Sequence, residues 1–260
     1  MPSPGEGPGV LYIVGSGPGN PDQMTGQALR AIRDSEYVIG NDSYLAPLTH
    51  LLSGKKVIRS SMGKEVERAK EAVSLARDHP VAMVSGGDPG VYGMASIVLE
   101  VAQHAGSGVR IEVIPGVTAA TASASRLGSP LSGDFAVISL SDLLTPMEVI
   151  EERLMHAFAM GIPVVLYNPK SRGRPHNFAR AMEIAARFCE PDTPLGLVRN
   201  AFREGETVEI ITLGEVAALE DKVDMHSTVI VGGRESRIWM VDEDVRRIIT
   251  PRGYHRKYVY

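Results

Sequence analysis

Short apolar runs recur along the first half of this chain, and segments with helical spacing separate them. The apolar runs span residues 10–14, 37–39, 57–58, 81–84 and 111–114. Apolar or small side chains recur three or four positions apart in the segments between them, at residues 24–34, 65–77 and 94–104. That spacing is typical of a helix with one buried face. Runs this short could also belong to buried helices, but their alternation with helices favours a parallel sheet covered on both faces.

A second series of apolar runs follows Pro115-Gly116 and a predicted helix of small residues at 118–127. These runs span residues 135–138, 164–167, 195–199, 208–211 and 228–231. The link at residues 200–207 is too short for a helical crossover, so part of the second sheet should be antiparallel. We therefore expect two α/β domains, residues 1–116 with a parallel sheet and residues 117–260 with a mixed sheet.

One helix start in the second half has a recognisable capping pattern. Thr145, Pro146 and Glu148 stand in the order of a capping box, with proline at the first helical position. The sequence predicts that the Thr145 hydroxyl accepts a hydrogen bond from the amide of Glu148.

Composition excludes several classes of function. The chain has 260 residues, with 27 Lys and Arg against 31 Asp and Glu, and its net charge of −4 argues against a general nucleic-acid binder. No apolar run approaches the ~20 residues that cross a bilayer, and the first nine residues do not resemble a signal peptide. The single cysteine, Cys189, excludes an internal disulfide and a multi-cysteine metal site. The seven histidines lack metal-binding spacing. We therefore expect a soluble, cytoplasmic protein without a bound metal, a nucleic-acid partner or a membrane partner.

A glycine loop follows the first predicted strand. Its sequence is Gly15-Ser16-Gly17-Pro18-Gly19, and Asp42 lies at about the distance at which a dinucleotide-binding fold holds ribose. However, the third glycine comes one position early, and Pro18 lacks an amide that could face a pyrophosphate. The loop is therefore a weak match to that motif, and a plain tight turn is an alternative interpretation. An NAD(P)-dependent oxidoreductase that uses this loop and Asp42 is a competing hypothesis.

A second glycine loop, residues 85–93, follows the run at 81–84. It contains four glycines, Asp88 and Pro89 within nine residues, more special residues than a simple β-turn needs. Adjacent glycines let backbone amides approach a ligand without a side-chain clash. The carboxyl ends of strands are also where open α/β sheets bind ligands. The pattern predicts a ligand-binding turn.

Cations gather after the predicted strand at 164–167. Lys170, Arg172 and Arg174 lie within five residues of one another, and Arg252 lies in a second basic segment near the C-terminus. A charge run is usually a solvated face. In an acidic protein, however, clustered guanidinium groups at a strand end suit a ligand that carries several carboxylates.

Three segments follow one another in the chain at residues 14–19, 85–93 and 114–120. Together they resemble the tetrapyrrole methylases, which are S-adenosylmethionine (SAM)-dependent enzymes of sirohaem and cobalamin synthesis. Within that family, three further segments resemble the precorrin-3B (cobalt-factor III) C17-methyltransferase branch, at residues 138–146, 166–174 and 249–254. The resemblance implies a homodimer of two-domain chains, with SAM in the cleft between the domains. It also implies methylation of C17 coupled to ring contraction. A sibling methylase that acts at another ring carbon and a non-catalytic tetrapyrrole carrier are the alternatives.

The resemblance also implies roles for individual residues. The expected SAM contacts are Pro18, Gly86, Gly87, Asp88, Val91, Thr118, Ala119, Asn168 and Ala201. Two of these depart from the family pattern, because some relatives have methionine in place of Asn168 and glycine in place of Ala201. The expected tetrapyrrole contacts are Gly15, Gly17, Gly19, Lys170, Arg172, Arg174 and Arg252. The acid–base candidates for ring contraction are Asp88, Tyr44, Ser141, Asp142 and Lys170.

Overall fold

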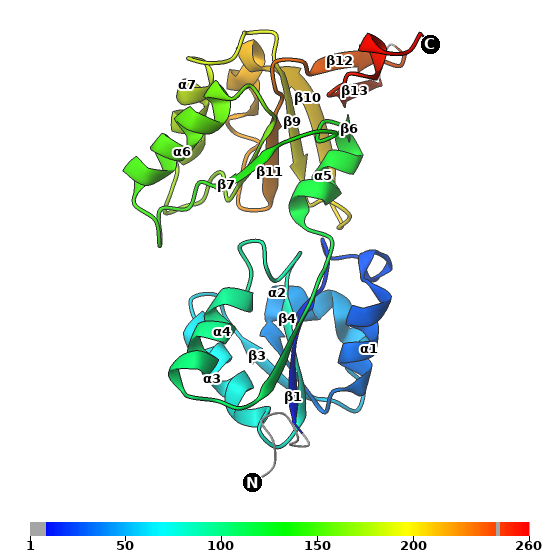
Figure 1. Ribbon diagram of the computed structural model, residues 1–260, viewed down its shortest axis with the longest axis vertical. Coiled ribbons are helices and arrows are strands. Elements are labelled where there is room, and N and C mark those ends of the chain that lie inside the picture. The colour runs from blue at the N-terminus through cyan, green and yellow to red at the C-terminus, as the bar shows by residue number, and fades with distance from the viewer. Residues whose placement is uncertain (1–8, 243–244, 260) are drawn as a thin grey trace. The chain divides into compact units, whose positions relative to one another are not determined.

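The computed structural model describes residues 9–242 and 245–259, and the chain divides into two compact units (Figure 1). Unit 1 is Met1–Ala119 and unit 2 is Ala120–Tyr260. Unit 1 holds a parallel sheet and unit 2 a mixed sheet, so the predicted fold class is confirmed. The assignment of residues 1–116 and 117–260 as the two domains stays a prediction.

The described part of unit 1 forms a five-stranded parallel sheet in the order β3-β2-β4-β1-β5. The strands are β1 (Val10–Gly15), β2 (Tyr37–Asn41), β3 (Lys56–Ser60), β4 (Pro80–Ser85) and β5 (Arg110–Ile114). The helices are α1 (Gly26–Asp34), α2 (Asp42–Leu45), α3 (Glu65–Leu75) and α4 (Ala95–His104). Short 3-10 helices occur at η1 (Pro21–Gln23) and η2 (Ala46–Leu51).

Helices cover both faces of the unit 1 sheet, which explains why its strands read as continuous apolar runs. Leu11, Ile13 and Met83 pack in one cluster with side chains of α3 and α4. Val14 and Ala82 point to the opposite face and pack in a second cluster with side chains of α1. Figure 1 shows α1 on one side of the sheet and α3 and α4 on the other. Because all the strands run parallel, the loops after them leave at one edge of the sheet.

Unit 2 contains a mixed sheet in the order β10-β9-β11-β8-β7 among its described residues. The strands are β7 (Ala136–Ser139), β8 (Val164–Tyr167), β9 (Pro194–Arg199), β10 (Thr207–Thr212) and β11 (Ser227–Val231). The helices are α5 (Ala119–Leu127), α6 (Met147–Ala159), α7 (Asn177–Ala185) and the 3-10 helix η3 (Leu213–Leu219). β9 and β10 pair antiparallel, as predicted, while β7 and β8 pair parallel.

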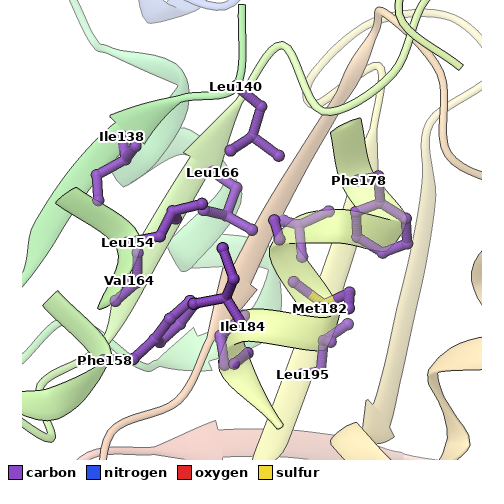
Figure 2. Packing of buried hydrophobic residues seen from close by; sticks show 14 of the residues in the cluster. Ile138, Leu140, Leu154, Phe158, Val164, Leu166, Phe178, Met182, Ile184 and Leu195 are labelled. Carbon is purple, nitrogen blue, oxygen red and sulfur yellow. The ribbon is translucent and has the colours of Figure 1, made fainter. Parts of the chain in front are cut away.

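Helices α6 and α7 cover one face of the unit 2 sheet (Figure 2). Leu154 and Phe158 of α6, with Phe178 of α7, are buried in the same cluster as strand residues Leu166 and Leu195. Burying each such side chain contributes roughly 1.5–3 kcal/mol. This packing fixes the ends of β7 and β8, and those ends carry several predicted site residues.

The structure departs from the sequence analysis in unit 2. α6 begins at Met147, after the extended residue Pro146, and no described side chain caps it, so the predicted capping box at Thr145 is wrong. Because Pro146 occupies the cap position itself, Thr145 lies one residue before the cap. A capping box does form at the start of η3, between Thr212 and Glu215.

A small sheet in unit 2 has no counterpart in the sequence analysis. It comprises β6 (Gly128–Ser129), β12 (Arg237–Met240) and β13 (Arg246–Ile249), and the 3-10 helix η4 (Tyr254–Arg256) follows it. β12 has three consecutive apolar residues that are mostly exposed, and β13 has two arginines among its four residues, so neither strand resembles the buried runs of the large sheets. Across the described residues, none of the helices is both long and apolar enough to span a membrane.

Candidate active site

The two glycine loops of unit 1 are joined through their main chains. The Gly17 N–H donates to the Gly87 carbonyl at 3.1 Å, and the Gly87 N–H donates to the Gly17 carbonyl at 2.8 Å. The Ser16 N–H also donates to the Ser85 carbonyl at 2.9 Å. The structure therefore brings together two segments that the sequence analysis treated separately.

A third segment, at Gly116, packs directly against both loops. A Cβ atom on Gly116 would lie 2.2 Å from the Gly87 oxygen, and a Cβ on Gly15 would lie 2.6 Å from the Gly116 nitrogen. Real Cβ atoms do not approach main-chain atoms this closely, so no side chain fits at either position. We call residues 15–17, 85–88 and 116 the glycine frame.

The Asp88 carboxylate ties the glycine frame together. One oxygen, Oδ1, accepts the Gly90 N–H at 2.8 Å, and the other, Oδ2, accepts the Gly116 N–H at 3.0 Å. Hydrogen bonds to a charged acceptor are stronger than those between neutral groups. The geometry therefore suits Asp88 to hold the turn after β4 against the segment that leads into α5.

Tyr44 lies against the same turn. It belongs to α2, which directly follows β2, and a Cβ on Gly86 would lie 2.5 Å from Cε1 of the Tyr44 ring. A residue larger than glycine would displace the ring. Two predicted site residues, Tyr44 and Gly86, are thus in direct contact.

The glycine frame leaves main-chain donors available to a ligand. Among the described residues, neither the Gly86 N–H nor the Asp88 N–H has an acceptor. Gly87 has a φ of +66°, and a Cβ there would still lie 3.8 Å from the Thr118 Cα and 3.9 Å from the Ala119 nitrogen. The frame could therefore hold a ligand that carries carboxylate or hydroxyl oxygens.

Other predicted residues of unit 1 lie near the frame in the chain. Pro18 and Gly19 continue the first loop, and Gly19 has a φ of +130°. The Val91 N–H donates to the Asp88 carbonyl at 3.2 Å, which continues the second turn. Asp42, the ribose candidate of the oxidoreductase hypothesis, instead pairs with Arg59 at 3.1 Å on the surface.

One residue that supports this edge was missed by the sequence analysis. Arg68 of α3 is buried, and its guanidinium donates to the Ser60 hydroxyl at 2.5 Å and contacts the Met94 sulfur at 3.4 Å. It thereby links the end of β3 to the residue before α4. No local signal marks it, because an arginine in a helix usually faces solvent.

In unit 2, the ends of β7 and β8 bring predicted residues together. The Asn168 side-chain amide donates to the Ser139 hydroxyl at 2.9 Å, and the Ser141 N–H donates to the same oxygen at 3.2 Å. Asn168 has a φ of +52°, in the left-handed region that asparagine tolerates better than most residues. Asp142 follows Ser141 and is exposed.

The cations after β8 have different environments, and we call residues 170–174 the cationic loop. The Lys170 ammonium donates to the Glu220 carbonyl at 2.7 Å. Arg172 is exposed and has no hydrogen bond or ion pair within the described ranges. The Arg174 Nε is buried without an acceptor among the described residues. Arg252 is exposed and lies between β13 and η4, outside this loop.

Ala201 lies in the loop between β9 and β10, and Glu206 stabilises this loop. Its neighbours Asn200 and Phe202 both have positive φ angles, of 52° and 58°. Glu206 accepts the Phe202 N–H and pairs with Arg126 through two contacts, of 2.8 and 3.0 Å. Burial alone would raise the pKa of Glu206, but the hydrogen bonds from Arg126 and Phe202 outweigh it and lower the pKa below its usual range.

The lowered pKa predicts an acid-sensitive loop. A carboxyl group whose pKa is depressed by folding stabilises the folded state above its unfolded pKa, about 4.3 for glutamate, and loses that contribution as the pH falls through the folded value. We expect Glu206→Gln to lower the melting temperature at pH 7, with the difference from wild type shrinking below about pH 4. Thermal unfolding of both proteins at pH 7 and below pH 4 measures this difference in melting temperature. The exposed neighbour Glu204 supplies the control, because Glu204→Gln should shift nothing; an equal shift in both variants would contradict the assignment.

Curated proteins resemble this chain over most of its length. The cobalamin biosynthesis protein CbiHC of Archaeoglobus fulgidus is 49% identical over 250 residues, 96% of this chain and 54% of that protein. The probable cobalt-factor III C(17)-methyltransferase of Salmonella typhimurium is 42% identical over 246 residues, 94% of this chain and 99% of that protein. The chain thus spans about half the length of the first relative and nearly all of the second.

Solved structures and a family model agree with these relatives. The crystal structure of the methyltransferase CobJ superposes with a TM-score of 0.86 and 32% identity, covering 94% of this chain and all of that chain. Uroporphyrin-III C-methyltransferase of Thermus thermophilus, complexed with S-adenosylhomocysteine, gives a TM-score of 0.63 and 26% identity over 86% of this chain and 97% of that chain. The family model of the tetrapyrrole (corrin/porphyrin) methylases matches residues 10–217 of this chain. Because that match covers well over half of the sequence, the chain belongs to the tetrapyrrole (corrin/porphyrin) methylase family.

Proposed function

We propose that this chain is a SAM-dependent C-methyltransferase of cobalamin biosynthesis that methylates C17 of precorrin-3B or cobalt-factor III, with associated ring contraction. The names of the Salmonella relative and of the CobJ structure support the reaction class. The observation that carries the proposal is the glycine frame, in which the N–H groups of Gly86 and Asp88 follow β4 and have no acceptor among the described residues.

The residues of unit 1 fit SAM as the methyl donor. Bound SAM supplies a methyl group already activated on a sulfonium, together with its leaving group, so we propose that no protein-bound metal takes part. The free N–H groups of Gly86 and Asp88 suit its carboxylate and ribose oxygens, and Gly87 leaves room for its approach. We assign contacts with SAM to Pro18, Gly86, Gly87, Asp88, Val91, Thr118, Ala119, Asn168 and Ala201. Holding the donor and the ring carbon in line could contribute roughly 7–11 kcal/mol.

The cationic loop fits a substrate with several carboxylates. The buried Arg174 Nε lacks an acceptor among the described residues, and a substrate carboxylate would satisfy it. Arg172 is exposed and free to form a second ion pair. Lys170 already donates to the Glu220 carbonyl but keeps further donors. We assign substrate carboxylates to these three residues, and we extend the proposal to Arg252 and to the loop of Gly15, Gly17 and Gly19.

We propose that one of five residues transfers the proton needed for ring contraction. Both carboxylate oxygens of Asp88 accept main-chain N–H groups, which favours a positioning role for it. Tyr44, Ser141, Asp142 and Lys170 are the other candidates. Tyr44 has the most specific placement, because its ring lies directly against Gly86 in the proposed SAM site.

Methyl transfer tests the proposed function directly. Purified protein, SAM with a ¹³C-labelled methyl group and either precorrin-3B or cobalt-factor III should give a product that carries the label at C17, located by NMR. Label at another ring carbon would identify a sibling methylase. Folded protein that binds the pigment but not SAM would be a carrier, and protein that binds NADH in place of SAM would favour the oxidoreductase.

Two further proposals concern the assembled protein. We propose a homodimer, as the family resemblance implies, and half-exposed apolar side chains such as Trp239 and Met240 on β12 provide surface for such an interface. We also propose a cytoplasmic location, because a single cysteine is typical of proteins from a reducing compartment.

A further inference from the structure

Two consecutive leucines of unit 2 are almost fully exposed. Leu143 is 79% exposed and Leu144 is 93% exposed. They lie in residues 140–146, which join β7 to α6 and which we call the leucine loop. Adjacent aliphatic side chains in water forgo the free energy of burial, and paired exposure of this kind marks a contact surface more often than a single exposed leucine does.

The leucine loop is firmly attached at both ends. At its start, the Leu140 N–H donates to the Tyr167 carbonyl at 2.8 Å, and the buried Asn177 amide donates to the Leu140 carbonyl at 2.8 Å. At its end, the Pro146 carbonyl accepts the N–H groups of Val149 and Ile150 in the first turn of α6. The two leucines therefore lie between two hydrogen-bonded ends of the loop, of which the Leu140 end is buried.

The cationic loop is the neighbour of the leucine loop. β7 and β8 pair in parallel, with Ser139 opposite Tyr167, so the segments that follow them leave the sheet at the same edge. The bond from Asn168 to Ser139 ties the two segments together at their roots. The exposed leucines and the guanidinium groups that lack partners among the described residues thus lie in segments that leave neighbouring strands at the same end.

We propose that Leu143 and Leu144 contact the face of the tetrapyrrole macrocycle while the cationic loop binds its carboxylates. A macrocycle with a flat conjugated face and a rim of acetate and propionate groups matches this combination of apolar and cationic surface. The inference rests on the proposed function for the identity of the substrate. It assigns the leucines to substrate affinity and not to SAM binding.

A double variant tests this contact. Leu143→Ser/Leu144→Ser should raise the dissociation constant for cobalt-factor III at least tenfold, measured by absorbance titration, and raise its KM similarly. The dissociation constant for SAM, measured by calorimetry, and the melting temperature should not change. The conservative Leu143→Met/Leu144→Met variant should restore pigment affinity.

Met160 supplies a matched control at the opposite end of α6. It is 66% exposed, so Met160→Ser removes one exposed apolar side chain at the far end of the helix, and pigment affinity should stay at the wild-type value. Unchanged pigment affinity in the double leucine variant would overturn the inference. Conversion of a wild-type dimer to a monomer in that variant, seen by sedimentation, would also overturn it, because the leucines would then cover a second copy of the chain.

Failure of the proposed function can be separated from failure of this inference. Wild-type protein that binds precorrin-3B or cobalt-factor III but methylates neither would contradict the enzyme, yet the leucine contact would stand if the double variant lost that binding. Methyl transfer with equal pigment affinity in both proteins would contradict only the leucine contact. Wild-type protein that binds no pigment would overturn both.

Discussion

Replacing Gly116 with alanine should weaken SAM binding by at least about 100-fold and reduce methyl transfer to background. The new Cβ would lie 2.2 Å from the Gly87 oxygen and 2.9 Å from the Gly15 Cα. All the atoms it meets are main-chain atoms of paired segments, so relief requires the glycine frame to open. A 100-fold loss corresponds to about 2.7 kcal/mol of binding free energy, the cost of misplacing the main-chain donors at Gly86 and Asp88.

The control for Gly116→Ala is the same substitution elsewhere in unit 1. No described atom lies within 4 Å of a Cβ on Gly108, so Gly108→Ala should keep wild-type SAM affinity in calorimetry. Both glycines belong to unit 1, so the melting transition followed by far-ultraviolet circular dichroism, which reports the whole chain, shows whether each variant stays folded. Wild-type SAM affinity in a folded Gly116→Ala protein would remove the glycine frame from the site.

The strands of the two large sheets could be predicted because the apolar side chains that they bury stand close together in the sequence. Strands covered on both faces need apolar side chains at every position, and the runs at 10–14 and 81–84 meet that need as β1 and β4. The antiparallel pairing of β9 with β10 followed from the length of one connection. In each case residues close together in the sequence were sufficient for the prediction.

Features that depend on distant residues could not be predicted. β12 is mostly exposed although three of its four residues are apolar, and β13 has two arginines among its four residues, so each strand is defined by pairing with the other and not by a buried apolar run of its own. The pattern at Thr145 satisfied a local rule, but the helix begins one residue later than that rule requires.

In the candidate site, too, local features could be predicted and contacts between distant residues could not. Glycine patterns pointed to both loops of the glycine frame, since a close main-chain approach leaves few alternatives to glycine. The bond that joins Asp88 to Gly116 spans 28 residues, and the one that joins Lys170 to Glu220 spans 50 residues. Neither pairing is visible in the sequence, and both change the chemistry that each side chain can offer.

Replacing Asp88 with asparagine should raise the dissociation constant for SAM about tenfold or more while the chain stays folded. Asparagine offers one acceptor oxygen, so either the Gly90 N–H or the Gly116 N–H would face an amide donor. A hydrogen bond to a charged group contributes roughly 1.5–3 kcal/mol, and its loss would loosen the turn that carries the Gly86 N–H. Calorimetry with SAM measures the change.

The products of Asp88→Asn distinguish a positioning role from proton transfer. If Asp88 holds the turn, methylation and ring contraction should fall together, because both depend on the bound donor. If it moves a proton during contraction, SAM affinity should stay normal and a methylated, uncontracted pigment should accumulate, visible by mass and absorbance. Asp42→Asn removes the same charge from a surface ion pair with Arg59, which is worth at most about 1 kcal/mol, so that variant should match wild type with SAM. Equal weakening by the two substitutions would show a general effect of charge and would remove Asp88 from the proposed SAM site.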